Sequence, residues 1–155
     1  MPDVFDRVRV TYEQKGEGPG FVREVEIMAQ STHLTKNYDA FAAACRLGRI
    51  LLSNGRHWAD HATPCDLLQR SLEHWAAGVS PTLVYFKALF LVAQAEGLPV
   101  RAQWLAELPA ALGQPARAVL GAATAASPST PVVPPRLTAH LENWLRTEGH
   151  FEIPP

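Results

Sequence analysis

The first thirty residues alternate between apolar and polar side chains in a way that predicts a β-hairpin. From Val4 to Tyr12 the even positions are apolar except for Asp6, and from Arg7 onward the odd positions are polar. This period of two is typical of a half-buried strand. The stretch KGEGPG at 15–20 has the composition of a turn, and a second alternating segment follows it over residues 21–29. The chain is therefore expected to begin with two antiparallel strands.

A hairpin of this kind needs something to pack against, because two strands alone are only marginally stable in water. After Ser31 the pattern favours helices and loops, and no further strand is predicted. We therefore expect the hairpin to rest on the helices, on another chain, or on strands encoded before Met1.

Composition limits the classes of protein to which the chain can belong. Its 155 residues, 47% of them apolar, are enough for one domain with a substantial core. Fourteen basic residues against fifteen acidic ones leave a net charge of −1, which excludes the strong basic excess of a dedicated nucleic-acid binder. Cys45 and Cys65 form no Cys-x-x-Cys pair, so neither a disulfide scaffold nor a zinc ribbon is expected. Without a signal peptide or a membrane-length apolar run, we expect a soluble cytoplasmic protein with no membrane partner.

Capping signals and apolar spacing predict three long helices. The first is capped by Ser31 or Thr32 and stops at Asn54-Gly55. Its predicted apolar face consists of Tyr38, Phe41, Ala42, Cys45, Gly48 and Leu52. Thr63 and Pro64 start the second helix, and Ser80 with Pro81 starts the third. The third is apolar on nearly all sides up to Gly97, so it is expected to be the central, buried helix.

The C-terminal part is predicted to hold shorter elements. Short helices are expected from Arg101 to Leu108 and from Pro115 to Ala123, followed by a proline-rich connector at 126–135. A final amphipathic helix runs from Leu137 to Glu148. The predicted fold class is mostly α: an N-terminal β-hairpin over residues 1–30, then a bundle of about six helices over 31–155.

One cluster contains residue types that bind metals. His57, Asp60, His61 and Cys65 are zinc-compatible, but they fall between a predicted helix stop and the next helix start. No glutamate follows the first histidine as a metalloprotease base would. We found no nucleophile motif and no phosphate loop, so we predict no catalytic residue, no metal and no cofactor, and the protein is not expected to be an enzyme.

Some cations and one tryptophan are candidates for nucleic-acid contact. Trp58 is expected in a loop, where its ring could stack on a base, whereas Trp75, Trp104 and Trp144 fall on apolar helical faces and are expected in the core. If the hairpin packs beside the first helix, a basic patch would form that consists of Arg7, Arg9, Arg46 and Arg49. The alternative is that these arginines are ordinary solvated charges.

The order of these segments resembles the bacterial DNA repair protein family RecO. The resemblance covers about Val4 to Val100 and rests on the hairpin VFDRVRVTYEQ and GFVREVEIM, then NYDAFAAACRLGRILL, TPCDLLQRSLEHW and the buried PTLVYFKALFLVAQAEGLPV. In that family an N-terminal oligonucleotide-binding barrel (OB-fold) ends in such a strand pair and leads into a helical domain. The hairpin would then be the remnant of a barrel. The family's early barrel strands and its four-cysteine zinc module have no counterpart here.

The resemblance implies a mediator of DNA repair and homologous recombination that performs no covalent chemistry. Such a protein binds single- and double-stranded DNA, anneals strands, and loads the recombinase with RecR on strands coated by single-strand-binding protein. The DNA-binding candidates that it suggests are Arg7, Arg9, Arg23, Arg46 and Arg49. Lys87 is a candidate for binding a partner's acidic tail, such as the C-terminal tail of single-strand-binding protein; otherwise its stem lies at the edge of the core.

A second reading keeps the fold and drops the DNA. In this alternative the chain is a helical protein-interaction module whose open hairpin edge docks a partner, by adding to the partner's sheet or to a second copy of the chain itself. The near-neutral charge favours this reading, and the ordered resemblance favours the first.

Overall fold

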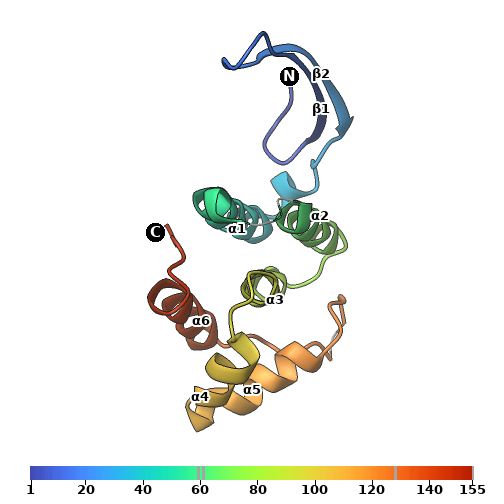
Figure 1. Ribbon diagram of the computed structural model, residues 1–155. Coiled ribbons are helices and arrows are strands. Elements are labelled where there is room, and N and C mark those ends of the chain that lie inside the picture. The colour runs from blue at the N-terminus through green and yellow to red at the C-terminus, as the bar shows by residue number, and fades with distance from the viewer. Residues whose placement is uncertain (59, 61, 128, 155) are drawn as a thin grey trace. The chain divides into compact units, whose positions relative to one another are not determined.

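The computed structural model describes residues 1–58, 60, 62–127 and 129–154. The chain divides into two units, Met1–Asn37 and Tyr38–Pro155, which are described separately below. Over the described residues the fold is mostly helical, with a two-stranded antiparallel hairpin followed by six α-helices, as the sequence predicts (Figure 1).

The first unit is the hairpin followed by a short 3₁₀ turn. Strands β1 (Arg7–Glu13) and β2 (Phe21–Ala29) pair antiparallel, with irregularities in register between Arg7 and Val8 and between Thr11 and Tyr12. One face carries the apolar pairs Val8–Ile27, Val10–Val25 and Tyr12–Val22. The 3₁₀ turn η1 spans Leu34–Lys36.

The first strand begins later than the apolar alternation predicted, at Arg7 rather than Val4. Asp6 explains the difference, because its carboxylate accepts the backbone N–H groups of Asp3 and Ser31, both at 2.9 Å. These bonds close a turn before β1, and they lower the pKa of the Asp6 carboxyl.

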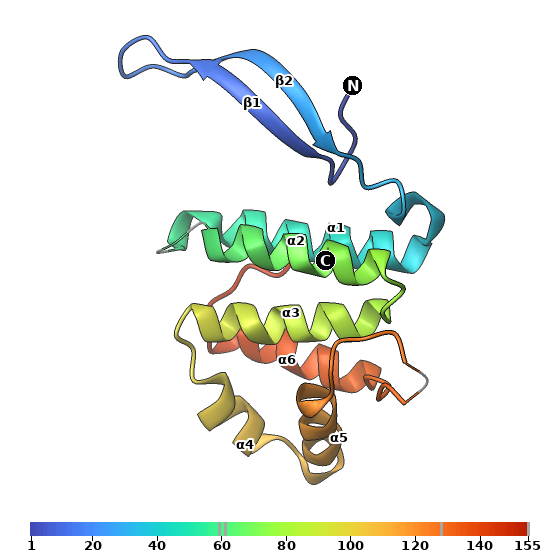
Figure 2. The same cartoon turned by 90° about the vertical axis from the view of Figure 1, so that its right-hand side faces the viewer.

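The second unit is a helical bundle built around α3. The helices and short turns of this unit are α1 (Tyr38–Asn54), η2 (Gly55–His57), α2 (Ala62–Ala76), α3 (Pro81–Ala95), η3 (Val100–Trp104), α4 (Leu105–Glu107), α5 (Ala110–Gly121) and α6 (Pro135–Thr147). Helix α3 contacts α1, α2 and α6, and Figure 2 shows it between the α1–α2 layer and the C-terminal helices. It is the central helix that its sequence predicts, with nine buried residues.

Aromatic side chains fill the core where α3 meets the segment after it. Trp104 is 1% exposed, and its ring centroid lies 6.1 Å from that of Phe86 and 6.0 Å from that of Phe90. Its indole N–H donates to Nδ1 of His140 on α6 at 3.0 Å. Trp75 and Trp144 are also buried, which confirms the core positions predicted for these three tryptophans.

Several helix ends follow their local signals. Gly97 has a φ of +74°, and the N–H of Leu98 donates to the carbonyl of Ala93 at 3.0 Å, which is the Schellman arrangement that terminates α3. Pro81 opens α3 as predicted, but the Ser80 hydroxyl bonds to the Thr82 hydroxyl and caps no backbone N–H.

Other boundaries differ from the prediction. Helix α1 begins at Tyr38, after η1, rather than directly after Ser31. Helix α2 begins at Ala62, one residue before the predicted cap Thr63, and the carboxylate of Asp60 accepts the N–H groups of Ala62 and Thr63. The predicted start at Pro115 lies inside α5, and the segment predicted as one helix from Arg101 forms the π-helical turn η3 and the short α4.

Candidate nucleic-acid interface

Helix α1 carries two apolar stripes, and the buried one is not the stripe predicted from the sequence. The predicted face is wrong: Tyr38 and Leu52 are each 82% exposed. The buried stripe consists of Ala40, Ala44, Leu47, Ile50, Leu51 and Asn54. Both stripes satisfy the helical spacing, but the buried one has alanines where α1 meets its neighbours, so the helices can approach closely.

The stripe that faces outward forms a shallow groove on which two arginines lie. We call it the α1 groove; its volume is about 440 Å³, and it is lined by Tyr38, Phe41, Ala42, Cys45, Arg46, Arg49 and Pro154. Arg46 and Arg49 are both exposed and lie one turn apart, and the exposed Tyr38 lines the same groove two to three turns nearer the start of α1. The groove therefore presents guanidinium groups and aromatic surface to solvent together.

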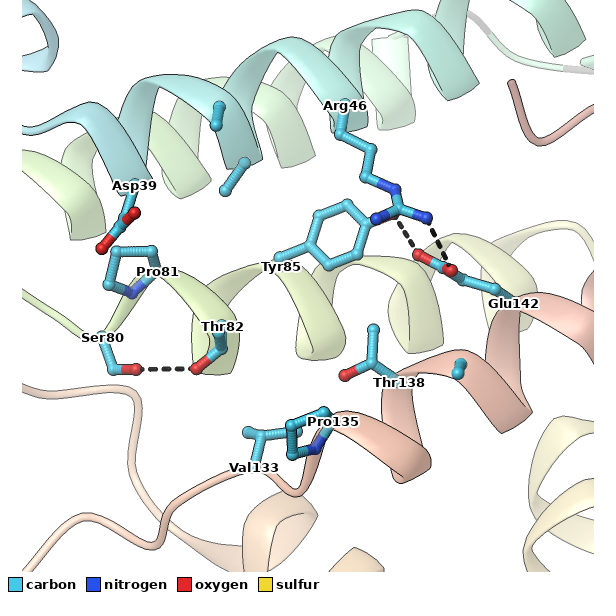
Figure 3. Close-up of a pocket in the computed structure, with 13 residues that line it drawn as sticks. Asp39, Arg46, Ser80, Pro81, Thr82, Tyr85, Val133, Pro135, Thr138 and Glu142 are labelled. Atoms are coloured by element: carbon cyan, nitrogen blue, oxygen red, sulfur yellow. Dashed lines mark hydrogen bonds and ion pairs between the residues drawn. The ribbon is translucent and has the colours of Figure 1, made fainter. Parts of the chain in front are cut away.

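Arg46 is held in place by a buried carboxylate. Its Nη2 lies 2.8 Å from Oε2 of Glu142 on α6, and the hydroxyl of Tyr85 on α3 donates to Oε1 of the same carboxylate at 2.6 Å (Figure 3). The guanidinium carbon also lies 5.7 Å from the centroid of the Tyr85 ring, within the range of a cation–π contact. Side-chain exposure is 9% for Glu142 and 48% for Arg46. Three helices thus meet at one carboxylate whose oxygens both accept a hydrogen bond.

This contact shifts the ionisation of Tyr85. Burial raises the pKa of its hydroxyl, and the hydrogen bond to the Glu142 carboxylate raises it further. The phenol therefore stays protonated and remains a hydrogen-bond donor to Glu142.

A second, larger groove adjoins this cluster on the other side of Arg46. It has a volume of about 780 Å³ and lies between α1, α3 and α6 (Figure 3). Its polar lining residues are Asp39, Arg46, Ser80, Thr82, Tyr85, Thr138 and Glu142. Ala42 and Arg46 line both grooves, so the two grooves meet at these residues of α1.

Sequence reasoning missed Tyr85 and Glu142. The available signal was the position of Glu142 directly after Leu141 and within three residues of Leu145, on the face that α6 buries. A carboxylate on a buried face requires a partner. Its partners lie 57 and 96 residues away in sequence, so local spacing does not identify them.

The arginines predicted on the hairpin are exposed, and two of them form ion pairs across it. Nη1 of Arg9 lies 2.8 Å from Oε2 of Glu26, and Arg23 pairs with Glu13. Arg7 is exposed at the start of β1. Exposed pairs of this kind contribute about 0–1 kcal/mol, so a phosphate can compete for these guanidinium groups. The predicted patch joining them to Arg46 and Arg49 spans the two units and stays a prediction.

The two remaining candidates, Trp58 and Lys87, contact other parts of the protein. Trp58 follows η2 as a loop residue but is only 7% exposed, which leaves little of its ring for stacking on a base. The ammonium of Lys87 donates to the carbonyl of Ala122 and lies 3.3 Å from the hydroxyl of Thr124, and burial lowers its pKa. Lys87 therefore ties α3 to the segment after α5.

The histidine-rich segment lies partly outside the described residues, which do not include His61. Asp60 serves as a helix cap, and Cys65 is an exposed free thiol. Among the described residues no group of three or more His, Cys, Asp and Glu side chains is placed to hold a metal ion.

Comparisons with known proteins assign no family. No family model matches the chain, and neither the curated proteins nor the solved structures include one that matches it significantly. Over the residues that the structure describes, no helix is both long enough and apolar enough to cross a bilayer.

Proposed function

We propose that this chain is a DNA-binding mediator of repair and homologous recombination of the RecO type. In this role it holds DNA strands through their phosphates, assists annealing, and helps load the recombinase together with RecR at the bacterial nucleoid. It performs no covalent chemistry.

The observation that carries the proposal is the α1 groove. Arg46 and Arg49 lie one turn apart, and an exposed tyrosine, Tyr38, lines the same groove. This combination suits a single strand, because guanidinium groups bind phosphates while an aromatic face stacks on a base. The order of a hairpin followed by a helical unit agrees with the layout that the RecO resemblance implies.

The local character of this site fits the charge of the chain. With a net charge of −1, long-range attraction of DNA is weak, so binding depends on a few contacts. Binding that depends on a few phosphate contacts has a shallow salt dependence, with a slope of about one unit for each contact.

The test is fluorescence anisotropy of a labelled single-stranded oligonucleotide at several salt concentrations. Arg49→Ala and Tyr38→Ala are the informative variants, because neither residue has an ion pair among those described and both are exposed. Arg117→Ala, which removes an exposed arginine from α5, is the matched control.

We expect Arg49→Ala to weaken binding and to reduce the salt slope by about one unit. Tyr38→Ala should weaken binding without changing the slope, and the control should bind like the unaltered chain. Absence of binding at low salt, or equal weakening by the control, would contradict the proposal.

A second candidate function is protein interaction without DNA. The hairpin favours it, because among the described residues the sheet contains only two strands and both outer edges are open. Open edges accept a strand from another chain.

A further inference from the structure

The sequence of β1 is complementary to itself when it is read in the opposite direction. Strand β1 runs RVRVTYE from Arg7 to Glu13, and its middle residue is Val10. If a second copy of β1 is laid antiparallel beside it, centred on Val10, then Arg7 faces Glu13 and Val8 faces Tyr12 of the other copy. The same two pairs recur on the opposite side of the two-fold axis. Apolar residues therefore meet apolar residues, and opposite charges meet.

This pairing keeps the two faces of the hairpin distinct. Val8, Val10 and Tyr12 lie on the apolar face, where they pair with Ile27, Val25 and Val22 of β2. Residues directly opposite in an antiparallel ladder share a face, so the second copy extends each face without mixing the two. The result is a continuous four-stranded sheet, and a sheet of three or more strands is far more stable than a lone hairpin.

The other edge does not offer the same match. Strand β2 runs from Phe21 to Ala29 with Val25 at its centre, and the same operation places Glu24 of each copy opposite Glu26 of the other. Like charges in directly opposite positions destabilise a sheet. The charges therefore favour β1 as the edge for self-association.

The ion pairs inside the hairpin also favour β1 as the edge for self-association, because they leave Arg7 available. Arg9 pairs with Glu26 and Arg23 pairs with Glu13 inside the hairpin, whereas no salt bridge is found for Arg7 among the described residues. Glu13 also pairs with Lys15, whose Nζ lies 3.7 Å from Oε1. That contact is long and exposed, and Glu13 retains 41% exposure of its side chain, so a second guanidinium can replace Lys15 there.

We propose that two copies of this chain associate through their β1 edges into a four-stranded antiparallel sheet with a two-fold axis at Val10. This identifies the partner for the open hairpin edge as the protein itself. The proposed dimer is independent of the proposed DNA binding, because it uses only residues of β1 and can be measured without DNA.

The first test is disulfide trapping with Val10→Cys in a full-length background carrying Cys45→Ser and Cys65→Ser. Directly opposite residues have Cβ atoms about 4.5–5.5 Å apart, so the two introduced thiols lie within reach of one another after small adjustments. We expect Val10→Cys to form the covalent dimer rapidly. Val25→Cys, at the centre of β2, is the matched control and should form it slowly.

The second test is sedimentation velocity over a wide range of protein concentration. Arg7→Glu replaces two attractive pairs by two repulsive ones, so the dimer should weaken at least about tenfold. Adding Glu13→Arg together with Arg23→Glu to that variant restores opposite charges between the copies and keeps an ion pair inside each hairpin, so most of the affinity should be recovered. Arg117→Glu, the same reversal on α5, should have no effect.

Three results would overturn the proposal. The first is a chain that stays monomeric at every concentration, and the second is faster trapping of Val25→Cys than of Val10→Cys. The third is a dimer that Arg7→Glu leaves unchanged.

Discussion

Replacing Arg46 by methionine tests whether the buried carboxylate of Glu142 depends on its guanidinium. Methionine keeps most of the aliphatic stem, so the main change is loss of the 2.8 Å contact with Glu142, which is 9% exposed. Breaking a fully buried ion pair costs about 3–5 kcal/mol, and a hydrogen bond to a charged group is worth about 1.5–3 kcal/mol. Because Arg46 is 48% exposed, the pair is partly solvated, and we expect a loss of about 2 kcal/mol.

Replacing the partner, Glu142, should destabilise the fold less than replacing Arg46. Glu142→Gln leaves the half-exposed guanidinium with access to water and keeps an oxygen that can accept the hydroxyl of Tyr85. We expect a loss of about 1 kcal/mol. The double variant, Arg46→Met with Glu142→Gln, should be more stable than the sum of the two losses predicts, because it leaves no buried charge unpaired.

The assay is thermal and urea unfolding of the full chain, followed by tryptophan fluorescence, which reports the helical unit because all four tryptophans lie there. A loss of about 2 kcal/mol corresponds to a fall in Tm of roughly 5–10 °C. If the losses of the two single variants are additive in the double variant, then lost packing rather than an unpaired charge explains the effect and our reasoning is refuted.

Two further predictions concern the ends of the chain's ordered elements. Asn54→Ala removes two 2.9 Å hydrogen bonds between its amide and the backbone of Glu152, so the C-terminal segment should detach with a loss of about 1–2 kcal/mol, seen as faster limited proteolysis of that segment; unchanged cleavage would contradict this. The pKa of Asp6 is lowered because it accepts backbone N–H groups from Asp3 and Ser31. Its stabilisation is therefore present above its unfolded-state pKa of 3.8 and is lost as the pH falls through the lower folded-state value. The hydrogen-exchange protection factors at the base of the hairpin, which are corrected for the intrinsic exchange rate at each pH, should therefore fall in acid, whereas those of Asp6→Asn should not show this fall.

Features set by neighbouring residues could be predicted from the sequence. The hairpin followed from its alternation, and the end of α3 followed from Gly97, because only a residue tolerant of positive φ suits a Schellman cap. The burial of α3 followed from its nearly continuous apolar surface, for which no choice of face is needed.

Features that depend on a choice between equivalent local patterns could not be predicted. Helix α1 has two stripes with the same spacing, and the buried one is selected by the helices that pack on it. Pro115 predicts a helix start because proline favours the first turn, yet α5 begins at Ala110 and tolerates the hydrogen bond lost at this interior proline. In both cases long-range contacts decide between locally acceptable alternatives.

Long-range contacts also distinguish the two arginines of the α1 groove, Arg46 and Arg49, which local sequence does not. Sequence spacing made the two arginines equivalent, but Arg46 is attached to Glu142 whereas Arg49 has no ion pair among the described residues. A phosphate bound to Arg46 must share a guanidinium with a nearby carboxylate, and the negative charge of Glu142 opposes it. A phosphate bound to Arg49 meets no such paired acid. Arg46 therefore contributes mainly by fixing α1 against α6, and Arg49 should account for most of the salt-dependent affinity of the α1 groove.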